Sequence, residues 1–220
     1  MKKVLAFDVY GTLINTHGVI VKLKEIIGEQ ATIFSEIWRQ KQLEYSFRRG
    51  LMNRYENFSV CTQQSLDYSC DVMSVQLTSS EKQELLNLYQ HLPMFDDVEQ
   101  GLQLLSKNHR LVAFSNGAAN TVNSLLSNAG IRDYFDDIIS ADEIKTFKPN
   151  PEIYHHLLTR TESSAENTWL ISSNPFDVIG ALSTNMNAAW VARTEKAVFD
   201  PWDITPNLVV NSLLDLNNKI

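Results

Sequence analysis

The chain contains little of what marks secreted, membrane-spanning or zinc-binding proteins. Only two of its 220 residues are cysteines, Cys61 and Cys70, which is too few for a disulfide framework in a chain of this size. No apolar run is long enough to span a bilayer, and Asp8 interrupts the first run in a way that a signal peptide does not allow. The histidines lack the spacing of a zinc site. We therefore expect a cytoplasmic protein with no membrane association.

Positive charge is also scarce. Lysine and arginine total 19 against 26 acidic residues, which gives a formal net charge of -7. This balance argues against a general binder of nucleic acids or anionic membranes, although a small anionic substrate stays possible because a local site can be positive. The composition, 44% hydrophobic and 20% charged, is ordinary for a globular protein, and the length suits one domain with an insertion.

The most informative stretch lies at the start of the chain, in residues 2–13. Residues 4–7 are a continuous apolar run, which indicates a strand buried on both faces of a parallel sheet. Asp8 follows at the carboxyl end of this strand, where open α/β sheets bind their ligands. Gly11 and Thr12 then turn the chain away. Asp8 is therefore a candidate for chemistry; the alternative is that it only accepts hydrogen bonds from the turn.

The next part of the chain, from Asn15 to Pro93, shows helical patterns without a convincing strand. We interpret it as an all-helical insertion that forms a lid over the site; the alternative is a helical subdomain with no gating role. The predicted helices are 19–27, 32–49 with Gly50 as C-cap, about 64–72, and one that starts at Thr78 or Ser80, where Glu81 and Gln83 give capping-box spacing.

From Pro93 onward, strand and helix patterns alternate. This alternation predicts a doubly wound parallel sheet with right-handed crossovers, built from residues 1–14 and 94–220, with 15–93 as the insertion. The predicted strands are 110–114, 138–139, 169–171, 188–191 and 207–210, and the predicted helices are 98–108, 118–129, 151–159, 177–184 and a short terminal one.

Polar clusters follow three of the apolar strands. Asp8 ends the first, Ser115-Asn116 ends the second, and residues 172–174 (Ser-Ser-Asn) end a later one. Because the carboxyl ends of parallel strands share one edge of a sheet, we expect these clusters to converge on a crevice. One Ser-Asn-Gly run also makes an ordinary turn. Three clusters together indicate a ligand site.

These residues resemble the motifs of the haloacid dehalogenase superfamily. Asp8 and Thr12 fit the first motif, whose aspartate is a nucleophile. Ser115-Asn116-Gly117 fits the second, where the hydroxyl and backbone amides bind the anionic group of the substrate. Lys148-Pro149 fits the third, and its lysine would hold the nucleophile ionised; the alternative is a solvated surface lysine. The resemblance implies a Rossmann-like core with a helical cap.

Two replaced acids indicate which branch of the superfamily the chain is similar to. Tyr10 stands where phosphatases carry a second aspartate, and Ser173 replaces the first acid of the fourth motif, leaving Asp177 alone. Because Mg²⁺ prefers hard carboxylate oxygens, we predict no metal and no other cofactor. Both replacements point to the L-2-haloacid dehalogenases.

Two more positions match that branch. The run from Trp38 to Tyr45 resembles its lid helix, which places Arg39 toward the active site, and Tyr154 matches a tyrosine beside the nucleophile. The alternatives are a solvated arginine and a half-buried core tyrosine. Pro175 and Phe176 depart from the branch, which often has a small residue followed by tryptophan. This departure leaves the substrate preference open.

The resemblance implies hydrolytic dehalogenation of short L-2-haloalkanoic acids, with inversion through an aspartyl ester and with halide as the second product. A homodimer is implied as well. The rival interpretations are a phosphatase of the same superfamily, which a Mg²⁺ requirement would favour, and a non-catalytic binding protein of the same fold. The implied catalytic residues are Asp8, Thr12, Arg39, Lys148, Tyr154, Ser172, Asn174 and Asp177, and the implied substrate and halide ligands are Tyr10, Arg39, Ser115, Asn116 and Phe176.

Overall fold

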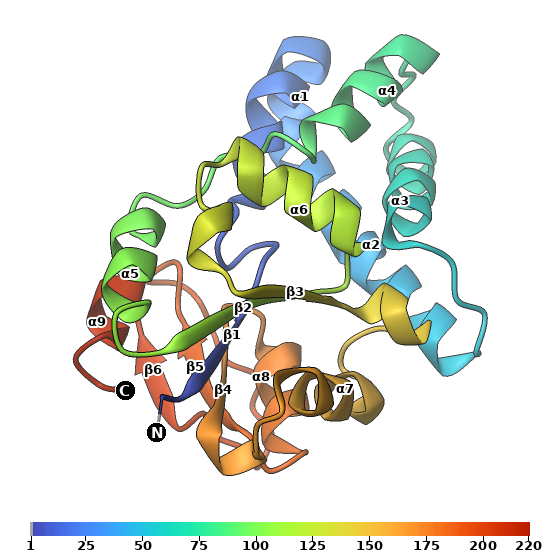
Figure 1. The fold of residues 1–220 in the computed structure, drawn as a ribbon. Coiled ribbons are helices and arrows are strands. Elements are labelled where there is room, and N and C mark those ends of the chain that lie inside the picture. The colour runs from blue at the N-terminus through green and yellow to red at the C-terminus, as the bar shows by residue number, and fades with distance from the viewer. Residues whose placement is uncertain (1) are drawn as a thin grey trace.

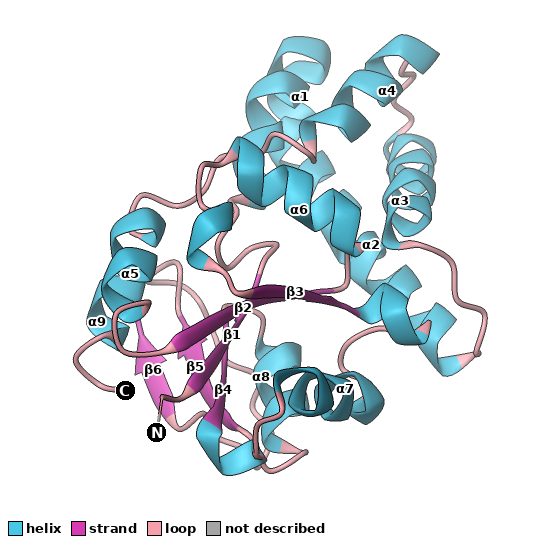
Figure 2. Ribbon diagram, in the orientation of Figure 1, coloured by secondary structure: helices cyan, strands magenta, loops and turns pink. Residues whose placement is uncertain are grey.

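The computed structural model describes residues 2–220 and contains a parallel β-sheet with helices on both faces (Figures 1 and 2). Its six strands lie in the order β3-β2-β1-β4-β5-β6, and every neighbouring pair is parallel. Strands β2 and β3 therefore lie on one side of β1, and β4, β5 and β6 lie on the other. This switch in strand order opens a crevice at the carboxyl ends of β1 and β4. The predicted doubly wound core is confirmed. The strands are β1 (Val4–Asp8), β2 (Arg110–Ser115), β3 (Asp137–Ser140), β4 (Thr168–Ser172), β5 (Asn187–Val191) and β6 (Leu208–Val210).

Alternation of side chains along β1 explains how both faces of the sheet are filled. Leu5 and Phe7 belong to a buried apolar cluster with α5, α6 and α9, whereas Val4 and Ala6 belong to a second cluster with α7 and α8. All five residues of β1 are buried, as expected for a central parallel strand. The core helices are α5 (Val98–Leu105), α6 (Ala119–Asn128), α7 (Pro151–Thr161), α8 (Pro175–Leu182) and α9 (Leu213–Leu216).

The helical segment between β1 and α5 lies together on one side of the sheet (Figure 1). The chain enters and leaves it through two adjacent stretches: Asn15 N donates to Pro93 O at 2.8 Å, and Phe95 N donates to Leu13 O at 3.1 Å. Its buried side chains join the same apolar cluster as one face of the sheet. The division of the chain at residues 14 and 93 stays a prediction. The helices are α1 (Val19–Ile27), α2 (Ala31–Leu51), α3 (Phe58–Met73) and α4 (Ser79–Leu88).

The end of α2 differs from the sequence-based prediction. Gly50 is not the C-cap, because the helix continues to Leu51 and the backbone N–H of Met52 still donates to Arg48 O at 2.9 Å. The left-handed conformation is instead adopted by Asn53, with φ 52°. Asparagine tolerates this region better than most residues, so no glycine is needed there.

The starts of α3 and α4 are explained by side-chain caps. Thr78 rather than Ser80 caps α4, because Thr78 Oγ1 accepts from Glu81 N at 3.2 Å while the Glu81 carboxylate accepts from Thr78 N at 2.7 Å. Asn57 Oδ1 accepts from Ser59 N at 3.0 Å, which starts α3 earlier than predicted.

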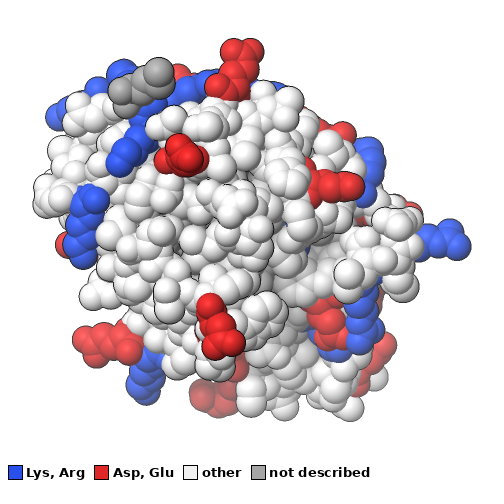
Figure 3. Space-filling view, turned by 90° about the horizontal axis from the view of Figure 1, so that it is seen from below, with Lys and Arg blue, Asp and Glu red and all other residues white. Residues whose placement is uncertain are grey.

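Charged side chains are mixed in sign on the surface that Figure 3 shows. Basic and acidic groups alternate around its margin, and uncharged residues cover most of its centre. This face therefore offers no broad basic area of the kind that binds nucleic-acid backbones. Within residues 2–220, none of the helices combines the length and apolar character needed to cross a bilayer.

Candidate active site

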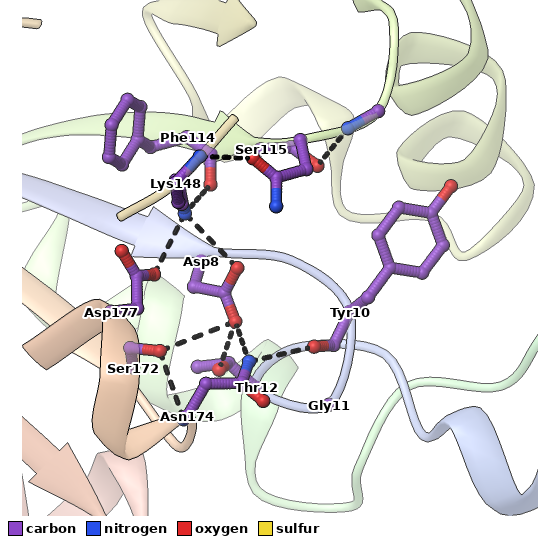
Figure 4. A network of polar contacts seen from close by, with 12 residues as sticks. Asp8, Tyr10, Gly11, Thr12, Phe114, Ser115, Lys148, Ser172, Asn174 and Asp177 are labelled. Carbon is purple, nitrogen blue, oxygen red and sulfur yellow. Dashed lines mark hydrogen bonds and ion pairs between the residues drawn. The ribbon is translucent and has the colours of Figure 1, made fainter. Parts of the chain in front are cut away.

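The Asp8 carboxylate is the centre of a dense polar network at the carboxyl end of β1 (Figure 4). Its Oδ2 atom accepts from Thr12 Oγ1 at 2.7 Å, from Asn174 Nδ2 at 2.7 Å and from Ser172 Oγ at 3.4 Å. Among the described residues, Oδ1 accepts only from Lys148 Nζ, at 3.2 Å. The network therefore holds the carboxylate in one orientation and leaves Oδ1 as the less bonded oxygen.

The structure places Lys148 in the interior, not on the surface. Only 1% of its side chain is exposed, and its ammonium lies between two carboxylates, Asp8 and Asp177. Nζ donates to Asp177 Oδ2 and to Phe114 O, each at 2.8 Å, in addition to Asp8. These contacts use all three donors of the ammonium. Lys148 therefore supplies a fixed positive charge beside Asp8.

Asp177 is fully buried in the first turn of α8, which starts at Pro175, earlier than predicted. Tyr154 OH donates to Asp177 Oδ1 at 2.8 Å, so the direct partner of the tyrosine is Asp177 and not Asp8. Burial raises the pKa of Asp177 to about 6, Lys148 lowers it in part, and Asp8 raises it further. Burial likewise raises the pKa of Tyr154 well above its ordinary value. The hydroxyl is therefore a hydrogen-bond donor at neutral pH.

A glycine on α8 makes room for this tyrosine. A Cβ atom on Gly180 would lie 2.3 Å from Tyr154 OH, far inside contact distance. The contact between Tyr154 and Asp177 thus depends on the missing side chain at position 180.

The end of β2 contributes Ser115 and Asn116, both buried. Ser115 Oγ accepts from Gly117 N at 3.1 Å, and Asn116 Oδ1 accepts from the backbone N–H of Lys148 at 2.8 Å. The Asn116 side chain therefore ties the Lys148 loop to β2. Its Nδ2 makes no hydrogen bond within residues 2–220, so this donor is available to a ligand.

Ser173 occupies the position where metal-dependent members of the superfamily carry an acid. Its hydroxyl donates to Gly11 O at 2.6 Å, and its backbone N–H donates to Thr12 Oγ1 at 2.8 Å. Ser173 therefore joins the loop after β1 to the loop after β4. The described residues contain no group of three or more His, Cys, Asp and Glu side chains that could hold a metal ion. Metal independence stays a prediction.

The helical segment contributes Arg39, on α2. Arg39 Nη2 donates to Tyr10 O at 3.2 Å and Nη1 donates to Gln42 Oε1 at 3.4 Å. No carboxylate in the described part of the chain forms an ion pair with it. Burial lowers the pKa of the Arg39 guanidinium, and the charge of Asp8 acts in the opposite direction. Arg39 is therefore a cation near Asp8 that uses two of its five N–H groups in hydrogen bonds within residues 2–220.

Tyr10 connects the two sides of the site through its backbone. Its carbonyl accepts from Arg39 Nη2 and, at 3.2 Å, from Asn174 Nδ2. Its ring points away from the Asp8 carboxylate (Figure 4) and packs on Gly117, where a Cβ would lie 3.2 Å from the ring. The ring also lies 6.0 Å from that of Phe58, on α3.

Phe176, on α8, is partly buried and packs against α2. Its ring meets Phe47 edge to face, with centroids 5.0 Å apart. Sequence reasoning did not select Phe47, and no spacing within the chain relates it to Phe176. It also did not select Gln42, although its position three residues after Arg39 puts both on one helix face.

Known proteins resemble this chain along most of its length. Residues 5–191 match the family model of haloacid dehalogenase-like hydrolases. The (S)-2-haloacid dehalogenase of Pseudomonas sp. (strain YL) is 34% identical over 212 residues, which is 96% of this chain and 91% of that protein. The haloacetate dehalogenase H-2 of Moraxella sp. (strain B) is 34% identical over 96% of this chain and 95% of its own.

Solved structures of known proteins also resemble this chain. The L-2-haloacid dehalogenase from Xanthobacter autotrophicus with chloropropionic acid covalently bound has a TM-score of 0.93 and 29% identity, and the match covers 99% of this chain and 98% of that one. The sequence motifs, the strand order and these likenesses together show that the chain belongs to the haloacid dehalogenase-like hydrolase family.

Proposed function

We propose that the protein hydrolyses the carbon–halogen bond of short L-2-haloalkanoic acids and releases D-2-hydroxy acids and halide. The observation that carries this proposal is the pairing of a firmly held carboxylate, Asp8, with a nearby cation, Arg39, that has no carboxylate partner within residues 2–220. A nucleophile and a receptor for a departing anion are what displacement of halide requires. The relatives named (S)-2-haloacid dehalogenase support the same assignment.

In the first step, Asp8 Oδ1 attacks C2 of the substrate from the side opposite the halogen. An Oδ1–C2 bond forms, the C2–halogen bond breaks with its electron pair leaving on the halide, and C2 is inverted. Oδ1 is the better nucleophile because Oδ2 already accepts from three side chains. The Ser115 hydroxyl and neighbouring backbone amides hold the substrate carboxylate in line. Arg39 and Asn116 receive the halide.

In the second step, water attacks the Asp8 side-chain carbon of the ester. Oδ2 is then the carbonyl oxygen, and its donors stabilise the negative charge that develops on it; these are Thr12, Ser172 and Asn174. Asp177, which Lys148 and Tyr154 hold in place, accepts a proton from the water. Collapse of the intermediate breaks the bond between this carbon and Oδ1, which leaves as the hydroxyl oxygen of the D-2-hydroxy acid and takes the proton that Asp177 holds. The new Asp8 carboxyl then releases the second proton of the water to solvent, which regenerates the carboxylate.

We further propose that residues 1–14 and 94–220 form the catalytic core and that residues 15–93 form a cap. The paired stretches around Asn15 and Pro93 support this division, and Arg39 is what the cap adds to the site. The homodimer and the cytoplasmic location stay predictions.

Halide release from L- and D-2-chloropropionate in the presence of EDTA tests the proposed function. We expect release from the L form alone, with D-lactate as the product. Phosphatase activity that requires Mg²⁺, with no halide release from either form, would contradict the proposal in favour of a phosphatase. Inactivity in both assays would contradict it in favour of a binding protein.

A further inference from the structure

A buried glutamine next to Arg39 has no role in the steps above. Gln42 lies on the buried side of α2 with no exposed surface, and its Oε1 accepts from Arg39 Nη1 at 3.4 Å. Its Nε2 is also buried and has no hydrogen-bond partner in the described part of the chain. An unsatisfied buried amide lowers the free energy of unfolding. Stability alone would thus favour an apolar residue of the same volume at this position.

Tyr89, which follows α4, packs against the same stretch of α2. Its ring is buried and packs edge-on against Trp38, with centroids 4.9 Å apart. Burial raises the pKa of Tyr89 to about 12. Tyr89 is accordingly neutral under ordinary conditions, like Gln42.

Both hydrogen-bond acceptors of Arg39 within residues 2–220 are neutral. A carboxylate at position 42 would form an ion pair with the guanidinium and cancel much of the field that an incoming anion experiences. An amide oxygen instead fixes the orientation of the guanidinium without neutralising it. The backbone carbonyl of Tyr10, the other acceptor, is neutral as well.

We infer that Gln42 is a positioning residue, which holds Arg39 through a neutral contact so that its full charge acts on the leaving halide. This inference rests on the proposed function, in which Arg39 receives the halide. It explains why a costly buried amide occupies a helix face that is otherwise apolar or hydroxyl-lined.

The test compares chloride with bromide as the leaving group in Gln42→Met and Gln42→Glu. Chloride is the poorer leaving group, so loss of a well-placed cation harms its displacement more. For Gln42→Met we expect kcat to fall about tenfold with L-2-chloropropionate and about threefold with L-2-bromopropionate. Its Tm should be equal or higher, because the unsatisfied amide is gone.

The second variant separates charge from position. Gln42→Glu keeps an acceptor oxygen beside Arg39 but adds a negative charge, so we expect a loss larger than that of Gln42→Met. Ser46→Ala is the matched control: Ser46 is buried on the same helix but donates only to Leu43 O, so no rate should change.

Calorimetric titration with bromide gives a readout that does not depend on turnover. Gln42→Met should bind bromide about tenfold more weakly than the unaltered protein. Unchanged bromide affinity, or equal losses for both substrates, would overturn the inference and leave Gln42 a packing residue. Inactivity of the unaltered protein on both substrates would instead contradict the proposed function, and the bromide titration would still decide the inference.

Discussion

The two sides of the site are built in opposite ways. On the core side, four side chains from the end of β4 and from the loops after β1, β3 and β4 donate to the Asp8 carboxylate, and Lys148 uses every donor it has. On the side of the proposed cap, the cap side, Arg39 makes only two hydrogen bonds within residues 2–220, both to neutral oxygens. The proposed function explains this difference. A nucleophile benefits from being held, whereas a cation that receives an anion benefits from remaining unpaired.

Replacing Asp8, on the core side, should cause the largest loss of activity. Asp8→Asn keeps the volume but removes the nucleophilic oxygen, so we expect halide release to fall about 10⁴-fold or more. Binding of the intact substrate, measured by calorimetry, should persist. Activity within about tenfold of the unaltered protein would show that Asp8 is not the nucleophile.

Replacing Arg39 changes the cap side of the site and leaves the hydrogen bonds of Asp8 in place. Arg39→Met removes the unpaired cation, and we expect kcat with L-2-chloropropionate to fall about 10²- to 10³-fold. Arg48→Met is the matched control, because Arg48 lies on the same helix with 62% of its side chain exposed. Similar losses in the two variants would mean that the effect comes from the helix and not from the site.

Acid pH should slow ester hydrolysis on the core side without a mutation. Burial raises the pKa of Asp177 to about 6, and Asp177 must be ionised to accept a proton from water. Below that pH we expect ester hydrolysis to slow about tenfold per unit, so that the ester accumulates on Asp8 and is detected by mass spectrometry after rapid quenching. A hydrolysis rate that is flat down to about pH 5 would remove Asp177 from this role.

The same shift predicts how stability changes with pH. Because the folded-state pKa of Asp177 lies above the ordinary value of 3.8, the folded protein holds this proton more tightly than the unfolded chain does. The contribution of this group to the free energy of unfolding is therefore present at low pH and is lost as the pH rises through about 6.

The smallest expected effect comes from crowding Tyr154. Gly180→Ala places a methyl group against the tyrosine hydroxyl, so we expect a loss of about 1–3 kcal/mol in unfolding free energy and a several-fold slower hydrolysis step. Gly50→Ala is the control on another helix, because its Cβ would meet nothing closer than 3.7 Å. It should stabilise the protein by about 0.5–1 kcal/mol. Equal destabilisation in both variants would contradict the special role of position 180.

The same contrast explains what the sequence predicts and what it does not. Asp8, Thr12 and Lys148 stand in short frames whose turns and spacings are local, and the parallel sheet places those frames at one edge. The contacts of Arg39 and Phe176 depend on how α2 packs on the core. No local sequence pattern predicts this packing. Phe47 enters the site region only through that packing.

Two details of the structure go beyond what local patterns predict. The periodic pattern of α2 predicts an end at Gly50, yet the helix continues to Leu51. The resemblance places Tyr154 beside Asp8, and the absence of a side chain at Gly180 lets its hydroxyl reach Asp177, which shares Lys148 with Asp8. The sequence contains no signal for the contact between Tyr154 and Gly180, because it is a tertiary one.

The covalent role of Asp8 is the central claim, and a single turnover in water enriched in heavy oxygen tests it most directly. With protein in excess over L-2-chloropropionate, attack of water on the ester must place the heavy oxygen in the Asp8 side chain, and the D-lactate must carry none. Peptide mass spectrometry of residues around Asp8 reads this outcome. Heavy oxygen in the lactate, with none in Asp8, would mean that water attacks C2 directly, and a covalent role for Asp8 would be contradicted.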